Sequence, residues 1–207
     1  MRPIVKAGIH IALVGNPNSG KSSLFNALTG LQQKVGNFPG VTVDKKTGDL
    51  QIGPHQSTLI DLPGTYSFYP KREDEWVAYR VLMGVDEDVK TDVILLIADA
   101  SNLKRNLLFC SQIIDLKIPV VLALTMNDLA QKKGIKVDIA GLQSDLGIPV
   151  VAVDARKNKG LGELKKVLGQ IIETPRSRNQ ESFIDNKNLA PAAIDAFKKT
   201  YPTHSDY

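Results

Sequence analysis

The chain has 207 residues, of which 43% are hydrophobic and 23% are charged, and it carries a formal net charge of +4. These proportions are typical of a folded globular protein and exclude wholesale disorder, collagen-like repeats and a coiled coil. Its basic residues are scattered among acidic ones, which argues against a nucleic-acid-binding face, and its single cysteine, Cys110, excludes a disulfide framework and a cysteine-rich metal site.

Apolar segments alternate with amphipathic ones along most of the chain. We predict strands at residues 9–15, 41–53, 56–62, 92–98, 118–125 and 148–153, and helices at 21–29, 74–83, 103–116, 139–146 and 161–172. Uninterrupted β-branched runs between helices are typical of a parallel sheet that is covered on both faces. The predicted fold is therefore α/β, with a mostly parallel sheet of six to seven strands in which one edge strand is antiparallel.

The composition changes at Thr174. Residues 174–188 are polar and charged, as expected of a linker, and residues 189–201 carry one weak helical pattern that cannot form a core alone. We therefore expect one domain over residues 1–173, and in residues 174–207 a linker with the start of a truncated helical domain. No apolar run reaches the roughly 18 residues of a membrane span, so we expect this fragment to be soluble.

A phosphate-binding loop is predicted between the first strand and the first helix. Residues 15–22 read GNPNSGKS and match G-x-x-x-x-G-K-[ST], with a strand before and a helix after, as the pattern requires. The glycines let backbone N–H groups approach the phosphates, Lys21 is expected to reach the β- and γ-phosphates, and Ser22 to ligate Mg²⁺. The predicted phosphate-binding residues are Gly15, Asn16, Pro17, Asn18, Ser19, Gly20, Lys21, Ser22 and Ser23.

A second motif, Asp61-Leu62-Pro63-Gly64, follows the predicted strand at 56–62. In P-loop proteins an aspartate at the end of a neighbouring strand holds Mg²⁺, usually through water. The N–H of Gly64 is then placed to sense the γ-phosphate. An Asp-Pro-Gly turn is common by itself, but the phosphate loop upstream favours the nucleotide interpretation.

A guanine-binding site is predicted at the ends of two later strands. Residues 125–128 read TMND where GTPases carry N-K-x-D. The Asp128 carboxylate can accept hydrogen bonds from guanine N1–H and the 2-amino group, which adenine does not offer. Thr125 is shorter than asparagine, which predicts a weaker link to the base and to the phosphate loop. The other predicted base contacts are Met126, which can replace the lysine stem, and Asp154, Ala155 and Arg156 in place of a Ser-Ala-Lys loop.

Four stretches together resemble the N-terminal cytoplasmic G domain of the FeoB family, the prokaryotic ferrous iron transporters. They are residues 15–22 (GNPNSGKS), 35–44 (VGNFPGVTVD), 61–67 (DLPGTYS) and 99–107 (DASNLKRNL). The second is the most specific, because an aromatic-Pro-Gly-Val-Thr-Val segment is not a general feature of P-loop proteins. The resemblance covers residues 8–173 and implies the Ras-like fold of an Era-like P-loop GTPase.

The resemblance also implies roles for individual residues. Switch I would comprise Gly40, Val41, Thr42 and Val43, and switch II would comprise Asp61, Leu62, Pro63 and Gly64. Mg²⁺ would be held by Ser22, Thr42 and, through water, Asp61, and the catalytic positions would be Thr42 and Gly64. Asn18 would help bind K⁺, which can neutralise transition-state charge. Because Thr65 stands where other GTPases often carry a catalytic glutamine, hydrolysis is expected to be slow.

The resemblance thus implies a GTP-binding and slowly GTP-hydrolysing regulatory domain with Mg²⁺ and K⁺ as cofactors. Its switch loops would respond to GTP and GDP and gate Fe²⁺ uptake by the transmembrane permease region of the same parent chain, at the cytoplasmic face of the bacterial inner membrane. A homo-oligomer is left open, and no nucleic-acid partner is expected. The alternatives are a soluble Era-like GTPase in ribosome or RNA maturation, and a nucleotide-binding scaffold without turnover.

Overall fold

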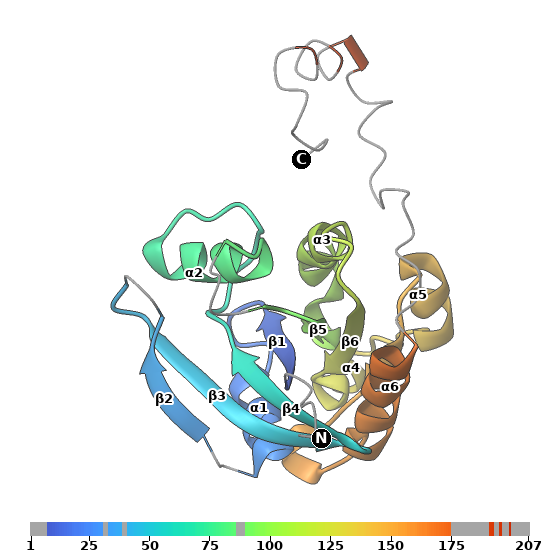
Figure 1. The fold of residues 1–207 in the computed structure, drawn as a ribbon. Helices are drawn as coiled ribbons and strands as arrows, with labels where there is room; N and C mark the ends of the chain where they lie inside the picture. The colour runs from blue at the N-terminus through green and yellow to red at the C-terminus, as the bar shows by residue number, and fades with distance from the viewer. Residues whose placement is uncertain are drawn as a thin grey trace.

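The computed structural model describes residues 8–30, 33–38, 41–85, 90–174, 191–192, 195 and 199. Within them, the strands form one seven-stranded sheet in the order β2-β3-β4-β1-β5-β6-β7 (Figure 1). The strands are β1 (Ile9–Gly15), β2 (Gln33–Asn37), β3 (Asp44–Ile52), β4 (His55–Asp61), β5 (Val93–Asp99), β6 (Val120–Thr125) and β7 (Val150–Ala152). The predicted α/β class is confirmed.

The sheet is parallel from β4 through β1, β5 and β6 to β7, whereas β3 is antiparallel to both of its neighbours. One strand therefore runs against the others, as predicted, but the prediction that it lies at the edge is wrong. The edge is β2, whose sequence QKVGN is exposed along its whole length. Such a strand has no apolar alternation, which is why the sequence did not reveal it.

Helices cover both faces of the sheet (Figure 1). They are α1 (Lys21–Thr29), α2 (Glu73–Leu82), α3 (Leu103–Ile114), α4 (Asn127–Lys132), α5 (Ile139–Leu146) and α6 (Leu161–Glu173), with short 3-10 turns η1 (Ala100–Asn102) and η2 (Ala155–Lys157). In β1, Ala12 and Val14 join one apolar cluster with α2 and α3, while Ile11 and Leu13 join a second cluster with α1 and α6. Burial on both faces explains the uninterrupted apolar runs.

Cys110 is buried on α3, where burial raises the pKa of its thiol to about 12, as expected of a core residue. The chain beyond α6 was predicted to be a linker and the start of a helical domain; apart from Thr174 and positions 191, 192, 195 and 199, this segment lies outside the described residues. Among the described residues, no helix has the length and the hydrophobicity that crossing a bilayer requires.

Candidate nucleotide site

The phosphate loop connects β1 to α1 through a backbone path that restricts several side chains. A Cβ atom on Gly15 would lie 2.8 Å from the carbonyl oxygen of Ile97, so this position requires glycine. Asn18 and Gly20 have φ angles of 63° and 90°, in the left-handed region that asparagine and glycine adopt most readily. The loop thus reaches the N-terminus of α1, where unpaired backbone N–H groups favour an anion.

The side chains of the loop divide into buried and exposed ones. Asn16 and Ser19 are 3% and 1% exposed, and the Asn16 amide and the Ser19 hydroxyl have no hydrogen-bond partner among the described residues. Asn18, Ser22 and Ser23 are exposed, and Pro17 and Lys21 are half-buried. The predicted metal-binding residues Asn18 and Ser22 are therefore accessible.

Lys21 and Asp61 meet although they lie 40 residues apart. The Lys21 Nζ atom donates a hydrogen bond to Asp61 Oδ1 at 2.5 Å, and the two side chains are only 14% and 11% exposed. The contact follows from the sheet, because β4 pairs in parallel with β1 and the Leu62 N–H donates to the Leu13 carbonyl oxygen at 3.1 Å. The carboxyl ends of both strands therefore lie next to the phosphate loop.

The donor set beside this pair suits Mg²⁺. Ser22 supplies a hydroxyl and Asp61 a carboxylate, and Mg²⁺ in proteins is commonly held by one or two such oxygens together with waters and substrate phosphates. Within the described part of the chain, no group of three histidine, cysteine, aspartate or glutamate side chains could form a metal cage. The residues present thus fit a cation shared with a phosphate ligand.

The predicted switch II segment contacts the phosphate loop at Gly64. A Cβ atom on Gly64 would lie 3.2 Å from the backbone nitrogen and the Cα atom of Pro17, so the two segments touch. The Thr65 N–H donates to the Gly15 carbonyl oxygen at 3.3 Å, and Thr65 is 4% exposed. Gly64 is therefore close enough to the loop for the predicted role of its N–H group.

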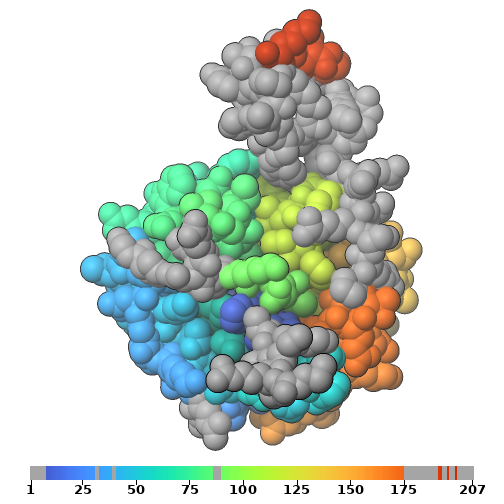
Figure 2. Space-filling model, viewed as in Figure 1, coloured from blue at the N-terminus to red at the C-terminus, as the bar shows by residue number. Residues whose placement is uncertain are grey.

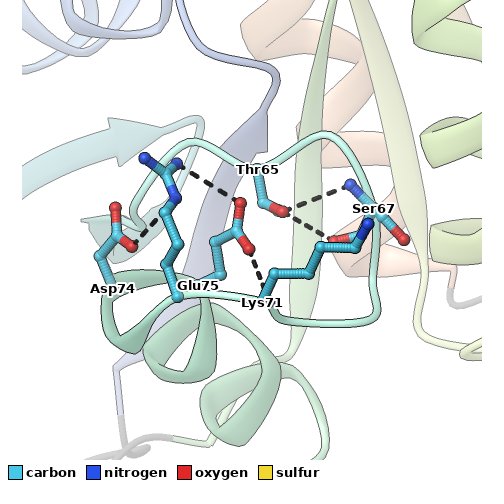
Figure 3. Close-up of polar contacts among 6 residues, drawn as sticks. Thr65, Ser67, Lys71, Asp74 and Glu75 are labelled. Atoms are coloured by element: carbon cyan, nitrogen blue, oxygen red, sulfur yellow. Dashed lines mark hydrogen bonds and ion pairs between the residues drawn. The ribbon is translucent and has the colours of Figure 1, made fainter.

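The loop after Gly64 leads into α2 through a charged turn (Figure 3). The Glu75 carboxylate accepts a hydrogen bond from the Lys71 N–H at 2.8 Å and lies 3.4 Å from Arg72 Nη2. Mainly because of the Lys71 hydrogen bond, and also because of the Arg72 charge, the pKa of Glu75 lies below its ordinary value. The first turn of α2 also holds Glu73 and Asp74, as the helix dipole favours.

Thr125 links the predicted base site to the phosphate loop. Its Oγ1 donates to the Ser19 carbonyl oxygen at 2.6 Å, and the Ala98 carbonyl oxygen lies 3.0 Å away as a second acceptor. The threonine hydroxyl thus supplies a donor to the phosphate loop, and the expected weakening of the link relative to asparagine stays a prediction. Met126 contributes apolar contact, with its Cε atom 3.6 Å from the place of a Cβ on Gly20.

The two base segments lie side by side at the ends of β6 and β7. The Val153 N–H donates to the Leu124 carbonyl oxygen at 2.9 Å, and Asn127 Nδ2 donates to the same oxygen at 2.7 Å. The sequence reading missed Asn127; its place directly before Asp128 was the available signal. Asp128 is exposed in the first turn of α4. Asp154 accepts from the Lys157 N–H at 3.2 Å and so caps η2, which holds Ala155 and Arg156.

Thr42 has no hydrogen bond with the predicted Mg²⁺ ligands Ser22 and Asp61 among the described residues. Its side chain is exposed between β2 and β3. Phe38 is instead buried, and its N–H donates to the Val43 carbonyl oxygen at 3.0 Å. Gly40 lies outside the described residues, and Mg²⁺ ligation by Thr42 stays a prediction.

Comparison with known proteins gives one family. Residues 9–168 match the family model FeoB_N, described as ferrous iron transport protein B. The Fe(2+) transporter FeoB of Leptospira biflexa serovar Patoc is 45% identical over 180 residues, which are 87% of this chain and 24% of that protein. That of Salmonella typhimurium is 44% identical over 159 residues, 75% of this chain and 20% of that protein. The chain thus spans about a quarter or less of these relatives.

Solved structures agree. The G domain of the T. maritima FeoB iron transporter is 41% identical with a TM-score of 0.72, over 82% of this chain and 100% of that one. The cytosolic domain of L. pneumophila FeoB is 36% identical with a TM-score of 0.80, over 95% of this chain and 76% of that one. An S. thermophilus NFeoB mutant bound to GDP is 38% identical with a TM-score of 0.79, over 94% and 73%.

Proposed function

The chain belongs to the family of the N-terminal region of ferrous iron transport protein B, and we propose that it binds GTP and hydrolyses it slowly as a regulatory domain. One observation carries the proposal. The phosphate loop, Asp61 and Thr125 meet at the carboxyl ends of adjacent strands, through the Lys21–Asp61 and Thr125–Ser19 contacts. Ligands of open α/β sheets bind at the carboxyl ends of the strands. The GDP in the similar S. thermophilus structure supports the same ligand class.

Guanine selectivity would come from Asp128. Its neighbour Asn127 donates through Nδ2 to the Val153 carbonyl oxygen at 3.4 Å, which supports a base site shared with the segment from Asp154 to Arg156. A carboxylate that accepts from guanine N1–H and the 2-amino group would lose both donors with adenine. Met126 would pack against the base plane and the phosphate loop. The backbone N–H groups around Ala155 would contact guanine O6.

Two cations complete the proposed site. Ser22 and Asp61, the latter through water, would hold Mg²⁺, which neutralises phosphate charge, and Thr42 would join them after switch I moves inward. The exposed side chain of Asn18 would hold K⁺, whose fixed charge can take the place of an arginine finger. Gly64 would donate its N–H to the γ-phosphate. Because Thr65 is buried and lacks a glutamine amide, turnover would be slow.

The biological role rests on the relatives, which are Fe(2+) transporters several times longer than this chain. We propose that residues 1–173 form the G domain and that residues 174–207 lead toward a membrane permease region of the same parent chain. Ordering of the switch loops by GTP, and their release on hydrolysis, would gate Fe²⁺ uptake from the cytoplasmic face of the bacterial inner membrane.

The test is a single-turnover GTPase assay in K⁺ and in Na⁺ with the wild type, Asn18→Ala and Asn158→Ala. Asn158→Ala is a matched control, because Asn158 has the same left-handed backbone conformation, with φ 53° against 63° at Asn18. We expect hydrolysis to be about tenfold faster in K⁺, and this gain to disappear only in Asn18→Ala, since a fixed charge stabilises the transition state.

The assay separates the parts of the proposal. Equal rates in the two cations would contradict the K⁺ site but leave GTP hydrolysis standing. If the protein binds GDP but does not hydrolyse GTP, the result would favour a nucleotide-binding scaffold. No binding of either guanine nucleotide would contradict the proposed function as a whole.

A further inference from the structure

The loop between Gly64 and α2 is fastened to α3 at two points. The Phe68 N–H donates a hydrogen bond to Gln112 Oε1 at 2.8 Å, and the guanidinium carbon of Arg105 lies 3.9 Å from the centroid of the Tyr66 ring. Arg105 and Gln112 are two helical turns apart on α3 and so face the same side. Figure 2 shows α2 (green) and α3 (yellow-green) beside each other. Phe68 of this loop belongs to the same apolar cluster as Val77 of α2 and Phe109 of α3.

Gln112 is an unusual residue for its place. It is 8% exposed, within a helix whose neighbouring residues Phe109, Cys110 and Ile113 belong to the apolar core. A buried amide is costly unless it is hydrogen-bonded, so an apolar residue would serve packing better. The partner of Gln112 is the Phe68 N–H, in the loop between Gly64 and α2. The Gln112 amide therefore contributes a hydrogen bond to the loop between Gly64 and α2 rather than apolar packing to the core.

Contacts continue from Phe68 back to Gly64. Thr65 Oγ1 donates to the Ser67 carbonyl oxygen at 2.7 Å and accepts from the Ser67 N–H at 3.3 Å, which closes a tight turn (Figure 3). The Thr65 N–H then donates to the Gly15 carbonyl oxygen, and Gly64 touches Pro17. The position of Gly64 against the phosphate loop is thus set from both sides, by the loop itself and by α3.

We propose that Gln112 and Arg105 are positioning residues for GTP hydrolysis, which hold the loop between Gly64 and α2 so that the Gly64 N–H is in place for the γ-phosphate. The proposal rests on the proposed function. A donor that is fixed in advance stabilises the transition state without reorganisation, whereas a freed loop would have to be ordered in each turnover. Binding of GDP, which has no γ-phosphate, should not depend on these contacts.

The test compares two substitutions at Gln112. Gln112→Met keeps the length and the apolar stem but removes the acceptor, while Gln112→Glu keeps an oxygen acceptor for the Phe68 N–H. Single-turnover GTP hydrolysis should slow about tenfold in Gln112→Met, the worth of one hydrogen bond in the transition state, and should be restored to within about threefold in Gln112→Glu. The dissociation constant for GDP should stay within about twofold of the wild type in both.

Arg105 provides a second variant, at which a substitution leaves the core packing unchanged because the side chain is exposed. Arg105→Met should slow hydrolysis about threefold through loss of the contact with Tyr66, and Lys104→Met, at the adjacent exposed cation, should not change the rate. Wild-type rates in both Gln112→Met and Arg105→Met, a faster rate, or a loss of GDP affinity in step with the rate would overturn the proposal. A wild-type protein that does not hydrolyse GTP would instead contradict the proposed function.

Discussion

Lys21 and Asp61 form a direct ion pair. Their proposed ligands differ, because the lysine would bind a phosphate and the aspartate would bind Mg²⁺. Their side chains are 14% and 11% exposed, so each charge is largely removed from water. The pair is compensated as long as both members are present. Removing one leaves a nearly buried charge alone, which costs about 3–5 kcal/mol.

A double-mutant cycle tests this pair in protein free of nucleotide. We expect Lys21→Met and Asp61→Asn each to lower the free energy of unfolding, and the double variant to lose about 1–3 kcal/mol less than the sum of the two. Urea denaturation supplies the measurement.

The control is the Lys34–Asp49 pair, whose side chains are 79% and 49% exposed. Lys34→Met and Asp49→Asn should be additive to within about 0.5 kcal/mol, because solvent screens an exposed pair. Additive effects at Lys21 and Asp61 as well would contradict the coupling.

The sequence predicted these residues but only part of their contacts. The loop pattern and the Asp-Leu-Pro-Gly motif located Lys21 and Asp61, because fixed spacing on a strand and a helix carries that information. The hydrogen bond from Thr125 to Ser19 joins positions 106 residues apart, and no local pattern encodes it. The GTPase pattern predicts a weaker link, because threonine is shorter than asparagine and lacks its amide donor. The pattern gives no sign that the threonine hydroxyl reaches the Ser19 carbonyl oxygen.

Among the elements, α2 carries in its first turn a carboxylate, Glu75, that accepts a hydrogen bond from the preceding turn. The hydrogen bond from the Lys71 N–H and the nearby Arg72 favour the ionised form of Glu75 and lower its pKa below the ordinary 4.5. A carboxylate with a lowered pKa in the folded state contributes stability above the unfolded value, and this contribution is lost as the pH falls through the folded pKa.

NMR titration tests this effect at the start of α2. The amide of Lys71 should shift with a midpoint below 4.5, because its hydrogen bond weakens when Glu75 is protonated. In Glu75→Gln, which has no titrating carboxyl, that transition should vanish while the rest of the spectrum keeps its dispersion. A midpoint at or above 4.5 would contradict the assigned cause.

Long, buried elements were easier to predict than short or exposed ones. The apolar runs of β1, β5 and β6 and the helical period of α3 and α6 identify their elements, since each is buried and regular. The six residues of α4 are too few to give a periodic signal, and β2 is held by its ladder with β3 rather than by burial. That missed strand also explains why β3 was expected at the edge.

For the whole molecule, the sheet order determines which motifs meet. The strand β1 lies between β4 and β5, and β6 lies next to β5. The phosphate loop, Asp61 and Thr125 are therefore found together at the carboxyl ends of these strands. The phosphate-loop, Asp-Leu-Pro-Gly and Thr-Met-Asn-Asp motifs predict this convergence, whereas composition and periodicity indicate only the α/β class. The fastening of the loop between Gly64 and α2 by α3 follows from neither, because it depends on where a loop packs in three dimensions.

The central claim is that the carboxyl ends of β4, β1 and β6 form a guanine nucleotide site. A calorimetric titration with GDP and with ADP, in the presence of Mg²⁺, tests this claim most directly. We expect GDP to bind and ADP to bind at least about a hundredfold more weakly. Asp128→Ala should remove this preference, whereas Asp145→Ala, at an exposed aspartate on α5, should keep it. Equal affinity for GDP and ADP, or no binding of GDP, would contradict it.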